Sequence, residues 1–331
     1  MISDKVEMRE LITLGGNGVL LRGTYHKARA KVVNNASDSN KNIGVMFLNA
    51  LFHPRAANAD SAVYWADSFA DRGYPSFRFD LPGLGDSYGE IPNDLLRFIN
   101  DGGYAAITSY KLKELVHSFG LSGAVIFGHC AGATTAIYAA SECKECKGLI
   151  LMDPYFNLPK SLTSKLRPEL VHWARRSKVG AIVRATYDRI REAPSALRKG
   201  ALPANANFAF VSRWKKVVSN GLPILILKSP EPAALGSNRL RSGTFDYLGH
   251  IISFAVGSNQ ITIKTIEDTD HSFANRAGRV AVRQHTETWL GEYFPEANGG
   301  TPLLQNQGLQ VQERNSVTLG APAPAYVSTG E

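Results

Sequence analysis

Apolar and polar residues alternate in the first part of the chain, and this pattern predicts a pair of strands. Residues 8–28 read MRELITLGGNGVLLRGTYHKA, with alternating arms on both sides of a GGNG turn. A period of two around a glycine-rich turn is typical of a β-hairpin. Because the GGNG stretch joins two strands, it lacks the strand–loop–helix context of a dinucleotide-binding loop.

Further along, apolar runs alternate with stretches of helical periodicity. The runs NIGVMFLNAL, PSFRF, GAVIFG, GLILM, PILILKS and QITIKTI predict strands, most of them buried. The stretches ADSAVYWADSFADRG, 93–120 (with Asn93 as its expected cap), AGATTAIYAASE and RAGRVAVRQHTETWLGEYF predict helices. Strands that alternate with helices in this way indicate an α/β fold, with a mostly parallel central sheet and helices on both faces.

Two regions depart from the alternation and suggest the domain organisation. Residues 155–222 have helical stretches and no clear strand, so we expect a helical cap insert. The core would then consist of residues 1–154 and 223–295. Residues 296–331 are rich in Gly, Pro, Asn, Gln and Ser, a composition typical of a disordered tail.

Charge distinguishes the cap insert from the core. The chain carries a net charge of +8, but residues 155–222 hold fourteen Lys or Arg against three acidic residues, which leaves −3 for the rest. A basic cap would attract an acidic partner, such as an acyl carrier protein, or an anionic substrate such as a CoA thioester. The same charges would also serve simply to solvate helix surfaces. Nucleic acid is a less favoured partner because no recognisable binding motif with interleaved aromatic residues is present.

Other features of the sequence bear on the cellular location of the protein and on metal binding. No run reaches the roughly 18 apolar residues of a membrane span, and the charged stretch MISDKVEMRE is unlike a secretory signal. Three cysteines do not make a disulfide framework, so we expect a cytoplasmic protein. Cys143 and Cys146 form one C-x-x-C pair, half of a zinc site at most. The sequence indicates no cofactor and no metal.

One short stretch carries candidate chemistry. In IFGHCAGATTA, a predicted strand ends at Gly128 and a predicted helix follows Cys130. Glycines on both sides of a tight strand–turn–helix expose the central side chain at the helix N-terminus. Backbone N–H groups and the helix dipole there favour a thiolate or a developing oxyanion. The preceding His129 is expected to pack into the sheet, and Cys130 could itself be a buried apolar residue.

With this strand–turn–helix elbow at Cys130 and three further segments in order, the chain resembles the α/β-hydrolase family from about residue 8 to residue 295. FLNALFHPR corresponds to the family's first oxyanion loop, which implies the backbone N–H of Leu51, or else of Ala50, as a donor beside that of Ala131. FRFDLPGLGDS matches the pattern R-x-D-x-x-G-x-G-x-S, where Asp80 and Asp86 are expected to hold the turn. EDTDHSF corresponds to the loop of the catalytic histidine, here His271.

The resemblance leaves the third catalytic residue open. The family commonly places its acid after the strand that follows the cap, where PILILKSPEP offers Glu231. Some members place it after the preceding strand, where LILMDP offers Asp153. A Cys130–His271 dyad without an acid is the third possibility, because a thiol of pKa about 8.5 needs less activation than a hydroxyl.

These residues imply nucleophilic acyl transfer through an acyl-thioester on Cys130. The leading interpretation is a hydrolase of esters or thioesters. A thioester exchanges with another thiol at little free-energy change, so an acyl- or aminoacyltransferase acting on carrier-protein or CoA thioesters is the alternative. A non-catalytic, ligand-binding member of the fold is the third hypothesis.

Overall fold

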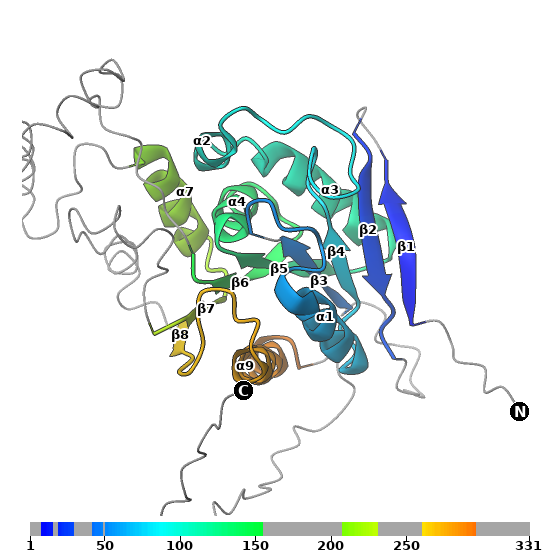
Figure 1. Cartoon of the computed structure of the whole chain (residues 1–331), viewed down its shortest axis with the longest axis vertical. Helices are drawn as coiled ribbons and strands as arrows, with labels where there is room; N and C mark the ends of the chain where they lie inside the picture. The colour runs from blue at the N-terminus through cyan, green and yellow to red at the C-terminus, as the bar shows by residue number, and fades with distance from the viewer. Residues whose placement is uncertain are drawn as a thin grey trace, which may run out of the picture. The chain divides into compact units, whose positions relative to one another are not determined.

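The apolar runs form neighbouring strands of one sheet. The computed structural model describes residues 8–15, 19–29, 42–48, 50–154, 207–230 and 260–295. In these residues the strands are β1 (Arg9–Leu14), β2 (Leu21–His26), β3 (Ile43–Leu48), β4 (Ser76–Phe79), β5 (Gly123–His129), β6 (Cys146–Met152), β7 (Ile224–Lys228) and β8 (Ile261–Thr265). They lie in the order β1-β2-β4-β3-β5-β6-β7-β8 (Figure 1).

The strand directions confirm the predicted hairpin and the predicted parallel sheet. β1 pairs with β2, and β2 with β4, in antiparallel fashion. The other neighbouring pairs, from β4–β3 to β7–β8, are parallel. Because parallel strands end at one edge of the sheet, the carboxyl ends of β3, β5, β6, β7 and β8 lie together there.

Helices connect the strands, and side-chain caps mark where several begin. They are α1 (Ser61–Asp71), α2 (Leu95–Asn100), α3 (Ala105–Ser118), α4 (Ala131–Ala140), α7 (Phe208–Ser219) and α9 (Arg276–Tyr293), with a short 3₁₀ helix η1 (Asn58–Asp60) before α1. The predicted cap Asn93 was wrong by one residue, because the Asp94 side chain accepts the Arg97 N–H. The long helical stretch is divided at Gly102, which has a left-handed φ of 81°.

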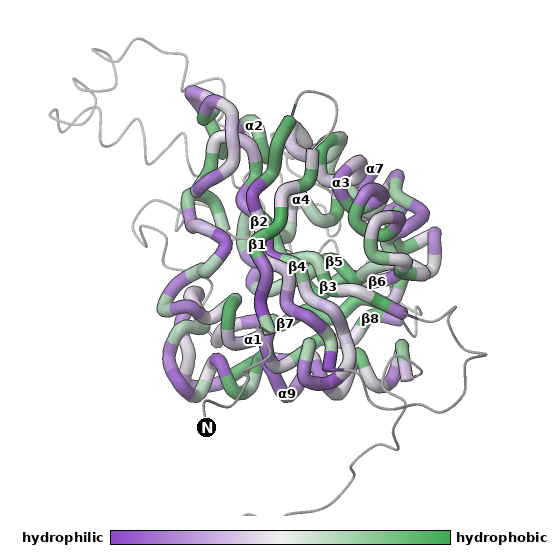
Figure 2. The backbone as a smooth tube through the Cα atoms, turned by 90° about the vertical axis from the view of Figure 1, so that its right-hand side faces the viewer, coloured by the Kyte–Doolittle hydropathy of each residue, from purple (hydrophilic) through white to green (hydrophobic). Residues whose placement is uncertain are grey.

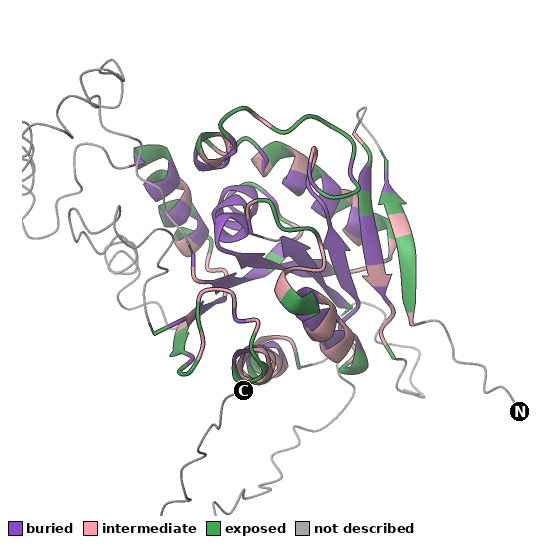
Figure 3. Ribbon diagram, in the orientation of Figure 1, coloured by how far each residue is buried: buried purple, intermediate pink, exposed green. Residues whose placement is uncertain are grey.

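The helices cover both faces of the sheet. One hydrophobic cluster joins the sheet to α1 and α9 through Trp65, Phe69 and Trp289. A second cluster joins the opposite face to α2, α3, α4 and α7. Hydrophobic residues run along the central strands (Figure 2), and the same strands are buried (Figure 3). The sequence prediction of a three-layer α/β fold is therefore confirmed.

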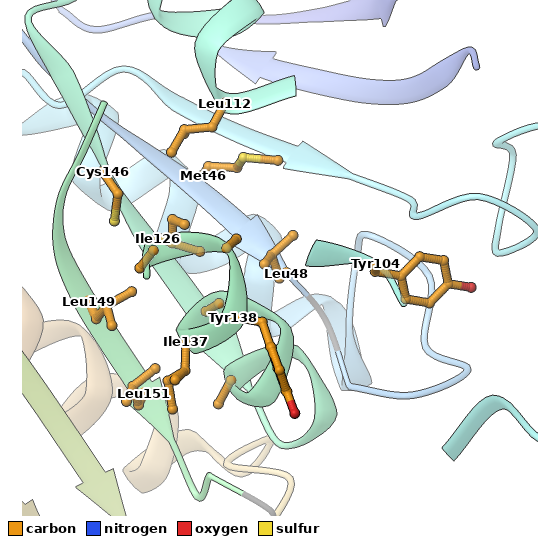
Figure 4. Close-up of a cluster of buried hydrophobic side chains, with 14 of the residues drawn as sticks. Met46, Leu48, Tyr104, Leu112, Ile126, Ile137, Tyr138, Cys146, Leu149 and Leu151 are labelled. Carbon is orange, nitrogen blue, oxygen red and sulfur yellow. The ribbon is translucent and has the colours of Figure 1, made fainter. Parts of the chain in front are cut away.

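Helix α4 lies in the centre of the second cluster and is buried at every residue. Its side chain Ile137 lies beside Leu149 and Leu151 of the sheet, whereas Tyr138 points away from the strands (Figure 4) and contacts Phe210 of α7. A helix between a sheet and further helices needs small or apolar residues all round, and AGATTAIYAA supplies them. The residue before this helix, Cys130, is thereby held in a fixed position.

The predicted cap insert is described only in part. Helix α7 falls in its last portion and packs against the sheet cluster, and residues 155–206 lie outside the described residues. The predicted tail, residues 296–331, also lies outside them. The described residues all belong to one compact unit. Within them, no helix is both long and apolar enough to cross a membrane.

Candidate active site

Cys130 occupies a sharp turn between β5 and α4. Its φ of 53° and ψ of −115° are strained for a residue with a side chain, and its N–H donates to the carbonyl of Met152 at 2.9 Å. A Cβ at Gly128 would lie 2.7 Å from the backbone of Ala133, which explains the glycine two residues before the cysteine. The predicted strand–turn–helix is confirmed, with the cysteine at the N-terminus of a helix. The expected exposure of its side chain is wrong, because Cys130 is 5% exposed and packs into the hydrophobic cluster around α4.

His271 lies in the loop between β8 and α9, 141 residues after the cysteine in sequence. The loop folds back on itself, with the Ser272 N–H donating to the Asp270 carboxylate at 2.9 Å and Asn275 Nδ2 donating to the Asp268 carbonyl at 2.7 Å. Phe273 is fully buried and anchors the loop to the core. These contacts place the His271 ring at the carboxyl edge of the sheet.

Asp153 faces His271 across this edge. His271 Nδ1 lies 3.1 Å from Asp153 Oδ2, and Asp153 has a left-handed φ of 35° directly after β6. Because a carboxylate can only accept, Nδ1 carries the proton and Nε2 is left as the basic nitrogen. Asp153 also accepts hydrogen bonds from the N–H of Ser229, at 2.8 Å, and from the Ser229 hydroxyl.

Cys130 and His271 interact electrostatically. Burial tends to lower the pKa of His271, but the hydrogen bonds and charges of Asp153 and Cys130 raise it to about 9. His271 Nε2 is buried and has no hydrogen-bond partner in aligned geometry among the described residues. Hydrogen bonds of catalytic groups are often poorly aligned in structures without substrate.

The predicted oxyanion residues lie beside the elbow. Leu48, the last residue of β3, pairs with Gly128 of β5, so the turn at Ala50 and Leu51 follows the strand next to Cys130. Leu51 has a left-handed φ of 29°, and Ala131 is the first residue of α4. Neither Leu51 nor Ala131 donates its backbone N–H to an acceptor in the described part of the chain.

The loop after β3 is fixed by an arginine that the sequence analysis did not single out. The Arg55 backbone N–H donates to Asp80 at 2.6 Å, and its guanidinium pairs with Asp80 and Asp86. Asp80 also accepts the N–H of Asp86 at 3.1 Å. The predicted role of Asp80 in holding the glycine-rich turn is confirmed, and the same carboxylate holds the loop after β3.

The two candidate acids have different outcomes. Asp153 lies against His271, whereas Glu231 lies outside the described residues. No pattern in the sequence marked Ser229, which donates to both oxygens of the Asp153 carboxylate. Its position at the end of β7 places it there, because β6 and β7 are neighbours whose residues Met152 and Leu227 pair.

The C-x-x-C pair has no features of a metal or redox site. Cys143 and Cys146 are buried free thiols, and burial raises their pKa values to about 11 and about 12. Their sulfurs lie near the carbonyl oxygens of Ser109 and Gly148. Within the described residues, no group of three or more His, Cys, Asp or Glu could hold a metal ion.

Solved structures with this architecture include proteins named as an esterase and as an α/β hydrolase. The chain is similar to DcsB, solved in complex with its substrate analogue (12% identity, covering 86% of this chain and 99% of that one, TM-score 0.56). It is also similar to the Pyrococcus furiosus esterase Pf2001 (13%, 86% and 93%, TM-score 0.54). A third neighbour is the α/β hydrolase GrgF from Penicillium sp. sh18 (15%, 87% and 99%, TM-score 0.54).

At such low sequence identities, the structural similarity is evidence for the fold alone. No curated protein matches the sequence. The model of the α/β hydrolase fold family matches residues 45–231, more than half of the chain. This match begins in β3 and includes β4, the glycine-rich turn and the elbow, and the sheet order agrees with it. The chain therefore belongs to the α/β hydrolase fold family.

Proposed function

We propose that this protein is an acyl-transfer enzyme in which Cys130 is the nucleophile, His271 the general base and Asp153 the orienting acid. The observation that carries the proposal is the hydrogen bond from His271 to Asp153. The other ring nitrogen is buried, has no well-aligned partner among the described residues, and the ring interacts with a cysteine at a helix N-terminus. A structural histidine would have both nitrogens satisfied, since a buried unpartnered nitrogen is costly. The leading reaction is hydrolysis of an ester or thioester.

In each half of the proposed reaction, His271 accepts a proton and later returns it. His271 Nε2 holds the proton that the thiol gives up, as its raised pKa of about 9 favours, and the Cys130 sulfur forms a bond to the substrate carbonyl carbon. The N–H groups of Leu51 and Ala131 hold the resulting oxyanion. The bond to the alcohol or thiol leaving group then breaks, and His271 returns the proton to that group. Water, deprotonated by His271, attacks the acyl-thioester, releases the free acid and restores the thiol.

We assign the role of catalytic acid to Asp153 because it is hydrogen-bonded to His271. The family more commonly places its acid after the strand that follows the cap, where Glu231 stands. The pattern of the sequence favoured Glu231, but the Asp153 carboxylate is the one that His271 contacts among the described residues. Glu231 remains the alternative acid. A thiol nucleophile must stay reduced, so the proposal fits the cytoplasmic location expected from the cysteine content.

Transfer is the second candidate, and the sulfur favours it. An acyl-thioester exchanges with another thiol at little change in free energy, and the basic residues 155–222 suit an acidic carrier protein or a CoA thioester. The transferase would share every step up to the acyl-enzyme. The acceptor that releases the acyl group would be a thiol or amine instead of water.

Intact-mass measurement tests the proposal and separates the two candidates. The protein is incubated with p-nitrophenyl acetate or acetyl-CoA, and we expect an acetyl adduct that maps to Cys130 and is absent from Cys130→Ala. Cys146→Ala, which removes another buried thiol, is the matched control and should keep the adduct.

The fate of the adduct separates the two candidate reactions. Loss of the adduct in buffer supports the hydrolase. An adduct stable in buffer but released by N-acetylcysteamine supports the transferase. No adduct with any acyl donor, and unchanged function in cells of Cys130→Ala, would favour the non-catalytic hypothesis.

A further inference from the structure

His129, the residue before the nucleophile, contacts the loop of the catalytic histidine. Its Nε2 lies 2.8 Å from the backbone carbonyl oxygen of His271, and the two rings have their centroids 5.2 Å apart. His129 is the last residue of β5, and its backbone continues directly into Cys130. One side chain therefore joins the two segments that carry the nucleophile and the base.

The direction of this hydrogen bond is fixed by chemistry. A carbonyl oxygen can only accept, so the proton lies on His129 Nε2. Burial, with a contribution from the charge of His271, lowers the pKa of His129 to about 4. The neutral ring with its proton on Nε2 is therefore the form present at neutral pH, beside a His271 whose pKa is raised.

The surroundings of His129 rule out several other roles. The charged and titratable groups that act on it are His271, Asp153 and His53, besides its chain neighbour Cys130. Its ring also lies edge-on to Phe273, with centroids 6.0 Å apart. His129 donates to a backbone oxygen and is buried, so it is not oriented to exchange protons with a substrate. Simple packing would be served equally well by an apolar ring, which would leave the His271 carbonyl without this donor.

We propose that His129 is a positioning residue: its ring N–H holds the backbone carbonyl of His271 and so keeps the His271 side chain between Asp153 and Cys130. This rests on the proposed function, because positioning matters only if His271 and Cys130 react. The segment ahead of α9 has no strand pairing of its own, so side-chain contacts must fix it. An error of about 1 Å in the position of a catalytic base can cost about 100-fold in rate.

The test uses two substitutions of similar shape. His129→Gln keeps an N–H donor three bonds from Cβ, as in His129 Nε2, whereas His129→Met has nearly the same volume and no donor. We expect the acylation rate with p-nitrophenyl acetate, followed as a single-turnover burst, to fall about 10- to 100-fold in His129→Met with little change in KM. His129→Gln should recover most of this loss. Ile126→Val, a truncation in the same strand, should leave the rate unchanged.

A second readout does not depend on turnover. The His271 pKa, measured by NMR titration, should fall in His129→Met toward its ordinary value of 6.5 and stay raised in His129→Gln. If His129→Met does not fold, His129→Asn replaces it, because its shorter amide cannot reach the carbonyl. The proposal is overturned if the donorless variant keeps the wild-type rate and His271 pKa, or if His129→Gln loses both equally. Failure of the wild type to acylate at all would instead count against the proposed function.

Discussion

His271 and Asp153 are joined by a hydrogen bond of 3.1 Å, although 118 residues separate them in the chain. Asp153 follows β6, whereas the position after β7 is occupied by Ser229, which donates twice to the same carboxylate. The carboxylate therefore has its oxygens satisfied by Ser229 and His271 together. Its orientation is fixed by the neighbouring strand, so the histidine meets an acid held in place instead of a mobile side chain.

The first prediction concerns the identity of the acid. Asp153→Asn keeps the shape of the side chain but removes the charge that holds His271 in its Nδ1–H form. We expect the rate of Cys130 acylation at neutral pH to fall by about 100-fold or more. The measurement is the burst of p-nitrophenolate from p-nitrophenyl acetate, with Glu231→Gln as the matched control. A larger loss in Glu231→Gln than in Asp153→Asn would assign the acid to Glu231.

The second prediction concerns the titration of His271. Burial opposes its protonation, but Asp153 and Cys130 raise its pKa to about 9 from an ordinary value of 6.5. We expect an NMR titration of the ring to show this raised value, with the signal assigned by its loss in His271→Gln. In Cys130→Ala the pKa should be lower, because the contribution of the sulfur is gone and that of Asp153 remains. A pKa unchanged by Cys130→Ala would mean that the two side chains do not interact.

The same shift makes stability depend on pH. A group whose pKa is higher in the folded state stabilises that state fully below its unfolded pKa, here 6.5, and this contribution is lost as pH rises through about 9. The free energy of unfolding from urea titrations should therefore decrease between these two pH values. The decrease should be smaller in His271→Gln. An equal decrease in both proteins would assign the effect to other groups.

How much the sequence could predict depends on the range of the interactions. The strands from β3 to β8 and the elbow at Cys130 follow from local apolar runs and glycines, which act over a few residues. The choice between Asp153 and Glu231 depends on which carboxylate lies within hydrogen-bond distance of His271. No local pattern in the sequence gives the distance between residues so far apart in the chain. The contacts made by Ser229 and His129 depend on strand neighbours in the same way.

The third prediction concerns the C-x-x-C pair. Burial raises the pKa values of Cys143 and Cys146 to about 11 and about 12, so little thiolate is present at pH 8. We expect iodoacetamide to label Cys130 well before these two residues in the native protein, as measured by peptide mapping. The double variant Cys143→Ala with Cys146→Ala should keep the acylation rate. A zinc ion retained by the wild type and lost from the double variant would contradict this prediction.

The loop after β3 depends on one guanidinium shared by two carboxylates in different environments. Arg55 pairs with both Asp80 and Asp86, but the Asp80 side chain is 1% exposed and that of Asp86 is 69% exposed. Asp80 additionally accepts the backbone N–H groups of Arg55 and Asp86. The two acids thus provide a matched comparison of a buried and an exposed ion pair with the same partner.

The fourth prediction follows from that difference in burial. Removing one partner of a buried pair leaves uncompensated charge and unsatisfied N–H groups, so Asp80→Ala should lower the free energy of unfolding by about 3 kcal/mol or more. The exposed pair is screened by solvent, so Asp86→Ala should cost less than about 1 kcal/mol. Urea titrations of the two variants measure both values. Because Asp80 also holds the loop that carries Leu51, Asp80→Ala should slow acylation under conditions where it is still folded. Equal costs for the two substitutions would show that burial of the pair does not determine its contribution.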